Sequence, residues 1–401
     1  MRAFIDELKS FPRRGDLILL LLCVVTSAFG CLVITSATNY TGALRHLFVQ
    51  VAAICLGVGI YAVVSSIDIS GIAENYRWLA FFNIIMLLML LTPFGTDKNT
   101  GNRSWLAFPF LPVDIQPAEF CKITFVIIMA SVMAKYQDRI SSLKAVFWMG
   151  AHLVLIVAFN MVISGDLGVT LIFVFVFIGM AWSSGVKLIW FLIGGGALAS
   201  AAPFIWNYGM KEYQRRRIEV IFNPEIDPLG MDERYHMLRS QRSLFGGGLT
   251  GQGLFNGNRT QGGVLYAQHT DFIFSSIGEE MGFVGCLLVM VMLMAIVARC
   301  IYVGTRSPDF LRKSLCFGVA AALVFQILIN VGMCIGLLPI IGLTLPFISY
   351  GGSSIVSLYA MVGLVSGVYA RPQRPVHERY IQPPIGMDIK EPRRRRRKEA
   401  I

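Results

Sequence analysis

Long apolar segments recur along this chain, and they constrain its fold more than any other feature. Runs of roughly 17 to 25 mostly apolar residues are long enough to cross a hydrocarbon core of about 30 Å as α-helices. The sequence therefore predicts an all-α polytopic membrane protein with about ten transmembrane helices. The expected spans are approximately 16–36, 47–66, 77–93, 119–135, 145–163, 167–183, 187–207, 281–300, 314–337 and 350–369.

Composition supports a membrane protein and excludes several other classes. Of the 401 residues, 55% are hydrophobic and 15% are charged, whereas soluble domains carry about 25% charged residues. Much of the net charge of +11 comes from the basic run Arg393 to Lys398, which suits anionic lipid headgroups and requires no nucleic acid. The eight cysteines fall within or beside the expected spans, without metal-type spacing, so neither a disulfide framework nor a metal site is predicted.

The distribution of Lys and Arg in the short loops predicts the orientation of the chain. Basic residues gather on one side of the membrane when the N-terminus is placed in the cytoplasm, as expected for cytoplasmic loops. We therefore expect a cytoplasmic N-terminal arm (1–15), a ten-span membrane domain (16–370) and a basic cytoplasmic tail (371–401). Both termini are then cytoplasmic.

One long segment, residues 207–270, separates the seventh and eighth expected spans and would lie outside the membrane on the extracytoplasmic side. It combines several arginines with the glycine-rich stretch Gly246–Gly253. Exposed backbone N–H groups beside guanidinium groups suit a phosphate or pyrophosphate. A flexible loop over lipid headgroups, with arginines paired to its own carboxylates, explains the same composition, and both interpretations stay open.

Asp271 stands where this segment meets the eighth span. Aspartate often caps the start of a helix, and apolar residues follow it at once, so Asp271 is either an N-cap or a functional carboxylate at the membrane edge. Ser275 and Glu279 follow at four-residue intervals, so a helix here would carry a polar stripe with Asp271 at its outer end.

Other polar residues are expected on the same side of the membrane. Glu119 and Lys122 are three residues apart in a helix and can pair, either pinning that helix or shaping a substrate groove. Arg103, Trp105 and Asp166 lie in neighbouring outer segments. The middle of each span lacks Asp, Glu, Lys and Arg, which argues against an ion-driven transporter and for chemistry at the outer interface.

Several ordered motifs resemble the SEDS family of bacterial shape, elongation, division and sporulation proteins over about residues 15–370. The similarity is closer to the RodA rod-shape branch than to the FtsW division branch. Its most specific motifs are His269-Thr-Asp271-Phe-Ile-Phe, Ile277-Gly-Glu279-Glu280 and Gly342-Leu-Thr-Leu-Pro346-Phe-Ile-Ser-Tyr-Gly351-Gly-Ser-Ser354. The chain departs from the usual family pattern at Asn102, Ser104, Ser164-Gly165 and Tyr266-Ala267.

This resemblance implies a peptidoglycan glycosyltransferase of the bacterial cytoplasmic membrane with an extracytoplasmic active site. Such proteins polymerise lipid II, a polyprenyl-pyrophosphate disaccharide-peptide, and work with a class B penicillin-binding protein, here expected to bind through membrane spans. The resemblance assigns the catalytic role to Asp271. It assigns substrate binding to Lys122, Glu119, Arg103, Trp105, Asp166, Arg217 and Glu280.

The expected chemistry requires one base. Pyrophosphate leaves as a stable anion, so the second carboxylate that an inverting glycosidase uses to protonate its leaving group is unnecessary. Asp271 would deprotonate the acceptor hydroxyl, while Lys122, Arg103 or Arg217 stabilises the departing pyrophosphate. No cofactor is required; a divalent cation could share the charge, but no carboxylate cage supports one. A lipid II flippase and a non-catalytic scaffold of a wall-synthesis complex are the alternative functions.

Overall fold

The computed structural model describes residues 11, 13–42, 44–97, 102–109, 114–227, 231, 234–265 and 267–371. Most of the expected N-terminal arm and the basic tail beyond Arg371 lie outside the described residues. The division of the chain into arm, membrane domain and tail therefore stays a prediction.

Helices account for most of the described chain, as expected for an all-α membrane protein. Within the described residues, eight helices are long and apolar enough to cross a membrane. They include α2 (Leu17–Thr38), α3 (Arg45–Ser65), α6 (Pro117–Lys135), α7 (Leu143–Ile163), α9 (Leu188–Phe204), α13 (Ile273–Arg306), α14 (Phe310–Cys334) and α15 (Gly352–Ala370). Two shorter apolar helices, α5 (Tyr76–Leu88) and α8 (Leu167–Ser183), occupy the other two expected spans, so the number of spans stays a prediction.

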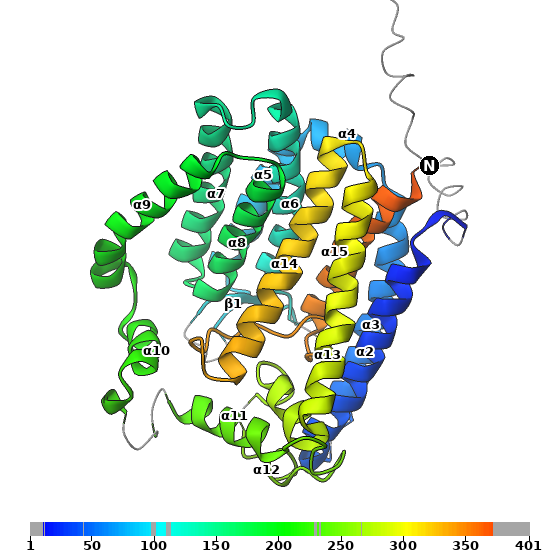
Figure 1. The fold of residues 1–401 in the computed structure, drawn as a ribbon, viewed down its shortest axis with the longest axis vertical. Coiled ribbons are helices and arrows are strands. Elements are labelled where there is room, and N and C mark those ends of the chain that lie inside the picture. Colours follow the sequence, from blue (N-terminus) through cyan, green and yellow to red (C-terminus); the bar gives the residue numbers. More distant parts are fainter. Residues whose placement is uncertain are drawn as a thin grey trace, which may run out of the picture. The chain divides into compact units, whose positions relative to one another are not determined.

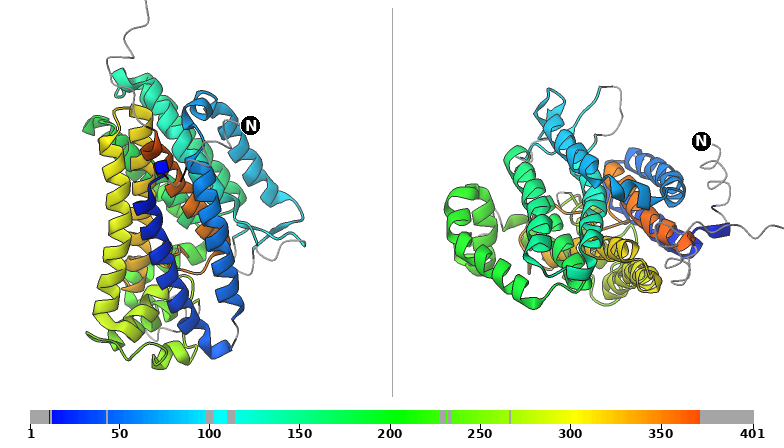
Figure 2. Two further views of the ribbon diagram at one scale, coloured as in Figure 1. Left: turned by 90° about the vertical axis from the view of Figure 1, so that its right-hand side faces the viewer. Right: turned by 90° about the horizontal axis from the view of Figure 1, so that it is seen from above.

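The helices differ strongly in how much of their surface the protein covers. Most of the apolar stretch of α6, α14 and α15 is buried, and α14 packs against α6, α8 and α13. By contrast, α9 has no buried residue, and Figures 1 and 2 both show it at the periphery of the helix group. Its uniformly apolar surface suits direct contact with lipid.

A buried ion pair joins α2 and α13 at the end of α13 remote from Asp271. Arg299 donates to both carboxylate oxygens of Asp16, at 2.9 Å and 3.0 Å, and Asp16 is 1% exposed. The same carboxylate caps α2 by accepting the Leu19 N–H at 3.1 Å. Two elements far apart in sequence are thereby fixed side by side.

Short elements connect the long helices. A two-stranded antiparallel ribbon lies between α5 and α6, with Gly95 opposite Leu106 and Thr96 opposite Trp105. The ribbon strands are β1 (Gly95–Thr96) and β2 (Trp105–Leu106). The other short elements are η1 (Asn39–Thr41), α4 (Ile69–Glu74), η2 (Met89–Leu91) and η3 (Gln137–Arg139).

The long segment between α9 and α13 is largely helical. It contains η4 (Ile205–Gly209), α10 (Glu212–Phe222), η5 (Pro224–Ile226), α11 (Tyr235–Gly246) and α12 (Asn258–Gln261). Figure 1 shows α11 and α12 at the end of the helix group where α13 begins. The described part of this segment therefore does not form the flexible loop that was one of its two interpretations.

The glycine-rich stretch also differs from the phosphate cradle suggested by its sequence. The Gln252 and Gly253 N–H groups donate to the Glu279 and Glu280 carbonyls at 2.9 Å and 3.0 Å. A Cβ atom on Gly247 would stand 1.9 Å from the Gly278 carbonyl oxygen. These glycines pack one backbone directly against another, so N–H groups expected to face a phosphate are already used inside the protein.

Candidate active site

Asp271 lies in the turn that leads into α13. The helix begins at Ile273, with Phe272 at the N-cap position and no side-chain cap, so the interpretation of Asp271 as an N-cap is wrong. The turn is closed instead by the Ala267 carbonyl, which accepts the Thr270 and Phe272 N–H groups at 3.1 Å and 3.2 Å. The Asp271 carboxylate is thus left available for another role.

The expected polar stripe after Asp271 exists but serves the packing of neighbouring helices. Ser275 lies 2.6 Å from the Ser240 hydroxyl of α11. Glu279 accepts the backbone N–H groups of Arg259 and Thr260 at 2.8 Å and 3.0 Å, which anchors the start of α12. The stripe therefore fixes the outer helices on α13.

The Asp271 carboxylate is partly exposed, and within the described residues it makes no hydrogen bond or ion pair. Surrounding protein removes much of its hydration and raises its pKa to about 6; the charge of Asp166 adds to this rise, while Arg217 opposes it. A carboxylate with a pKa near neutrality can hold or release a proton under working conditions. This property is typical of a general base.

Asp166 caps the start of α8 beside the Asp271 turn. One of its oxygens accepts the Val169 N–H at 3.1 Å, and the other accepts the Ser104 hydroxyl at 3.3 Å. Burial raises the pKa of Asp166, and the charge of Glu119 contributes to the rise. The charge of Glu119 thus acts on Asp166, and the charge of Asp166 acts on Asp271.

Arg217 supplies positive charge to the same region. It donates to the Ile340 carbonyl at 3.2 Å, and its guanidinium carbon lies 5.3 Å from the centre of the Tyr213 ring. Lys211 has its Nζ 5.9 Å from the same ring centre. The fold of α10 thus brings Lys211 and Arg217 beside one ring, a relation that the sequence did not predict.

A cleft separates α10 from the start of α8 and the segment around Ile340. Its lining includes both the acidic Asp166 and the basic Arg217. The cleft is also lined by Asn102, Gly168, Tyr213 and Ile340.

The expected pairing of Glu119 and Lys122 is confirmed. Lys122 Nζ lies 2.8 Å from Glu119 Oε1, and both side chains are buried. The second Glu119 oxygen accepts the Ser357 hydroxyl of α15. Lys122 is 2% exposed and paired with Glu119, and it does not line the cleft.

Three other predicted residues lie in separate surroundings. Arg103 donates to the Thr92 carbonyl at 2.9 Å, and Trp105 belongs to β2. Glu280 accepts the Ser36 hydroxyl at 2.6 Å and the Gln261 side-chain amide at 2.8 Å. Glu280 does not line the cleft beside Asp166; it ties α13 to α2 and α12.

A second cavity of about 490 Å³ lies on the other side of the Asp271 turn. Its walls include Tyr40, Tyr235, Arg239 and His269. Burial and the neighbouring His46 lower the pKa of His269 to about 4, so its imidazole is neutral near pH 7. His269 therefore does not act as a cation here.

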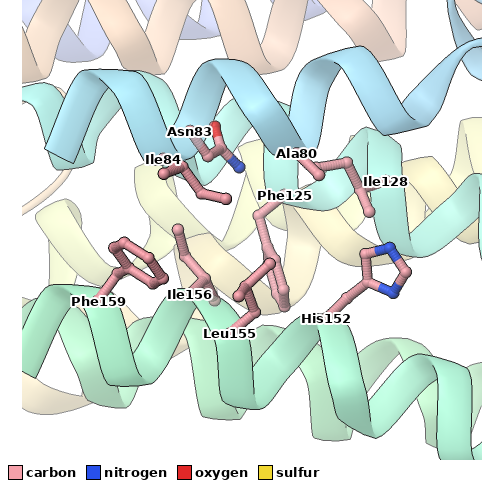
Figure 3. Close-up of a pocket in the computed structure, with 9 residues that line it drawn as sticks. All are labelled: Ala80, Asn83, Ile84, Phe125, Ile128, His152, Leu155, Ile156 and Phe159. Atoms are coloured by element: carbon pink, nitrogen blue, oxygen red, sulfur yellow. The ribbon is translucent and has the colours of Figure 1, made fainter. Parts of the chain in front are cut away.

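The described residues contain no group of three or more His, Cys, Asp and Glu side chains placed to hold a metal ion. A further pocket lies between α5, α6 and α7, and its lining includes none of the predicted site residues (Figure 3). Its lining is mostly apolar, including Phe125, Ile156 and Phe159, and the Nδ1 of its His152 lies 2.8 Å from the Trp148 carbonyl oxygen.

The fold and the cleft together define a polytopic membrane protein with a carboxylate-centred site at one end of its helices. A family model described as "Cell cycle protein", for the FtsW, RodA and SpoVE proteins, matches residues 16–373. The chain belongs to this family, which confirms the resemblance indicated by its motifs.

Curated relatives align over most of the chain. One is the "Probable peptidoglycan glycosyltransferase FtsW" of Trichlorobacter lovleyi, 33% identical over 364 residues, covering 88% of this chain and 93% of that protein. Another is the "Peptidoglycan glycosyltransferase MrdB" of Escherichia coli K12, which is 30% identical over 359 residues. The match covers 88% of this chain and 93% of that protein. The identities to these two proteins are similar, so the closer relation to the RodA branch stays a prediction.

Solved structures share the fold. One chain, from "Structural coordination of polymerization and crosslinking by a peptidoglycan synthase complex", is 26% identical with a TM-score of 0.74. The match covers 92% of this chain and 99% of that chain. The rod shape determining protein RodA of Thermus thermophilus is 24% identical with a TM-score of 0.64, covering 88% and 96% of the two chains.

Proposed function

We infer that this protein is a peptidoglycan glycosyltransferase that polymerises lipid II at the outer face of the cytoplasmic membrane. Curated relatives at about this level of identity carry the name peptidoglycan glycosyltransferase, which supports the class of reaction. The observation that carries the proposal is the Asp271 carboxylate, which is partly exposed and unpaired within the described residues and has a pKa near neutrality beside Arg217.

In the proposed reaction, the GlcNAc 4-hydroxyl of one lipid II attacks the MurNAc C1 of another. Asp271 accepts the hydroxyl proton as the new C–O bond forms. The C1–O bond to pyrophosphate breaks on the opposite face, which inverts the α-linkage to β-1,4 and releases polyprenyl pyrophosphate. A base with a pKa of about 6 is largely ionised at neutral pH and still takes up a proton during reaction.

Stabilisation of the departing pyrophosphate is assigned chiefly to Arg217. A guanidinium group suits phosphate oxygens because its N–H donors lie in a planar fork. Arg217 lines the cleft that Asp166 also lines, and Lys211 lies beside the same Tyr213 ring. Lys122 supports the site indirectly by holding Glu119, and Asp166 sets the charge that Asp271 experiences.

The orientation and the partner belong to the same proposal. Asp271 stands just before the start of α13, and the Asp16–Arg299 pair stands near the other end of this helix. With the N-terminus in the cytoplasm, Asp271 then lies on the outer side, where lipid II is polymerised. A class B penicillin-binding protein that binds through the membrane spans would crosslink the product, and a structure of a peptidoglycan synthase complex with a similar fold supports such a partnership.

The test uses purified protein and labelled lipid II, with glycan chains resolved on a gel. Wild-type protein, alone or with a penicillin-binding protein, should form polymer, while Asp271→Asn should form none although its side chain has the same shape. Glu225→Gln, an exposed acidic residue of the same outer segment, is the matched control and should keep activity. Wild-type rates from Asp271→Asn would overturn the assignment of the base, and absence of polymer from every preparation would favour a flippase or scaffold.

A further inference from the structure

Three consecutive backbone carbonyls in the Asp271 turn are held by hydrogen bonds from outside the turn. The His269 carbonyl accepts the Tyr350 N–H at 2.9 Å, and the Thr270 carbonyl accepts the Ser349 hydroxyl at 2.6 Å. The Asp271 carbonyl accepts a side-chain N–H of Asn330 at 2.8 Å. The turn is thus fastened at every residue from His269 to Asp271.

Asn330 holds two walls of the site with one amide group. Its Nδ2 donates to the Asp271 carbonyl and also to the Leu343 carbonyl at 2.7 Å. Leu343 follows Gly342, where a Cβ atom would stand 3.6 Å from Asp271 Oδ2. The amide therefore sets the Asp271 peptide and the backbone beside its carboxylate at a fixed separation.

The surroundings of Asn330 exclude a role in direct contact with substrate. Its side chain is 0% exposed and projects from α14, one of the most buried helices of the described chain. Both hydrogens of the NH₂ group are donated to the Asp271 and Leu343 carbonyls, and no other side chain of similar size can donate two hydrogen bonds in this way. An apolar replacement removes the side-chain donor of the Leu343 carbonyl and leaves the Asp271 carbonyl only the weak Cys334 thiol donor at 3.7 Å. A carboxylate would bring two acceptors against these carbonyls.

We propose that Asn330 is a positioning residue for glycosyl transfer, acting through the Asp271 peptide to aim the carboxylate at the acceptor hydroxyl. This inference rests on the proposed role of Asp271 as the base. A base displaced by a fraction of an ångström still meets the substrate but transfers its proton poorly. The loss should therefore appear in kcat, with KM for lipid II little changed.

The experiment compares Asn330→Leu with Gln326→Leu in purified protein. Gln326 is the matched control because it lies one helical turn earlier on α14, is 3% exposed and makes no described hydrogen bond to the Asp271 turn. Asn330→Leu should lower kcat about 10- to 100-fold, whereas Gln326→Leu should stay within about threefold of wild type. Asn330→Asp, which has nearly the same shape, should be as impaired as Asn330→Leu because it lacks the two donors.

Hydrogen exchange supplies a readout that is independent of activity. Peptides covering residues 267–273 and 340–350 should exchange faster in Asn330→Leu than in wild type, while peptides from α2 and α3 stay unchanged. The acidic limb of the pH–rate profile should also move, since the surroundings of the carboxylate change. A general loss of folding would instead raise exchange everywhere.

Failure of this inference differs from failure of the proposed function. If Asp271→Asn is inactive and Asn330→Leu keeps wild-type kcat and exchange, Asn330 is not a positioning residue. If Asn330→Leu and Gln326→Leu lose activity equally, the effect belongs to the packing of α14 and the inference is again overturned. Polymer formed by Asp271→Asn at the wild-type rate would show that Asp271 is not the base. The positioning role proposed for Asn330 would then have no object.

Discussion

The Ser104 hydroxyl lies 2.7 Å from the Ser164 hydroxyl, although these residues belong to segments on either side of α6 and α7. Both stand where the sequence departs from the usual family motifs. The neighbouring departures also meet, since Asn102 Oδ1 lies 3.5 Å from the position of a Cβ atom on Gly165. The departures at Asn102, Ser104, Ser164 and Gly165 are therefore grouped in space beside Asp166, which accepts the Ser104 hydroxyl.

This contact predicts that Ser104 and Ser164 act as a unit. Ser164→Ala should lower kcat/KM about fivefold, because it removes the hydrogen bond between the two hydroxyls, worth about 1 kcal/mol. Ser104→Ala should lower it further, because it also removes the hydrogen bond to Asp166. The double variant should lose little more than Ser104→Ala alone, since both substitutions remove the shared bond. A double-mutant cycle of polymerisation rates measures this, and a loss equal to the product of the two single losses would contradict the coupling.

The raised pKa of Asp271 predicts how activity depends on pH. A base must be ionised, so kcat/KM should be constant above the pKa of about 6 and fall about tenfold for each pH unit below it. Initial rates of lipid II polymerisation between about pH 4.5 and 8 measure this acidic limb of the pH–rate profile. A flat profile down to about pH 4.5 would show that the rate does not depend on a carboxylate with this pKa.

Substitutions of the charged residues beside Asp271 should move the acidic limb of the pH–rate profile in opposite directions. Asp166→Asn removes a negative neighbour and should shift the limb to lower pH, while the amide oxygen can still cap α8. Arg217→Gln removes a positive neighbour and should shift the limb to higher pH as well as lowering kcat. The same polymerisation assay gives both profiles. Shifts of equal sign would contradict the electrostatic arrangement of the cleft.

The membrane helices and some local pairs could be predicted because their causes are local. A helix in lipid satisfies its own backbone hydrogen bonds, so an apolar run of sufficient length implies one. The pairing of Glu119 with Lys122 follows from their three-residue spacing. The motif before the eighth span pointed to Asp271 without any knowledge of the fold, and the catalytic role of Asp271 stays a prediction.

Long-range relations could not be predicted in the same way. Arg217 reaches the cleft, with Lys211 beside the same Tyr213 ring, because α10 folds over the start of α8, and the sequence of α10 alone does not specify that packing. Asn330 looked like one neutral polar residue within a span, and only the fold shows that it holds Asp271. Glu280, expected at the substrate, pairs instead with Ser36 and Gln261 because α13 turns at Gly282.

Gly282 provides a final prediction, about folding. It has φ 65° and ψ −163°, so α13 bends there, and a Cβ atom would stand 2.4 Å from the Gly251 backbone nitrogen. Gly282→Ala should lower the stability of the protein by roughly 2 kcal/mol or more, because the backbone conformation is strained for alanine and the neighbouring chain must move.

The matched control is Gly194→Ala in α9, where nothing lies within 4 Å of the added atom. Alanine favours a helix over glycine by about 1 kcal/mol, so this substitution should leave stability equal or slightly higher. Thermal aggregation of detergent-purified protein compares the two variants. Equal midpoints of thermal aggregation for the two variants would contradict the close approach of Gly282 to the Gly251 backbone. The glycine-rich stretch would then tolerate a side chain against the bend of α13 beside Glu279 and Glu280.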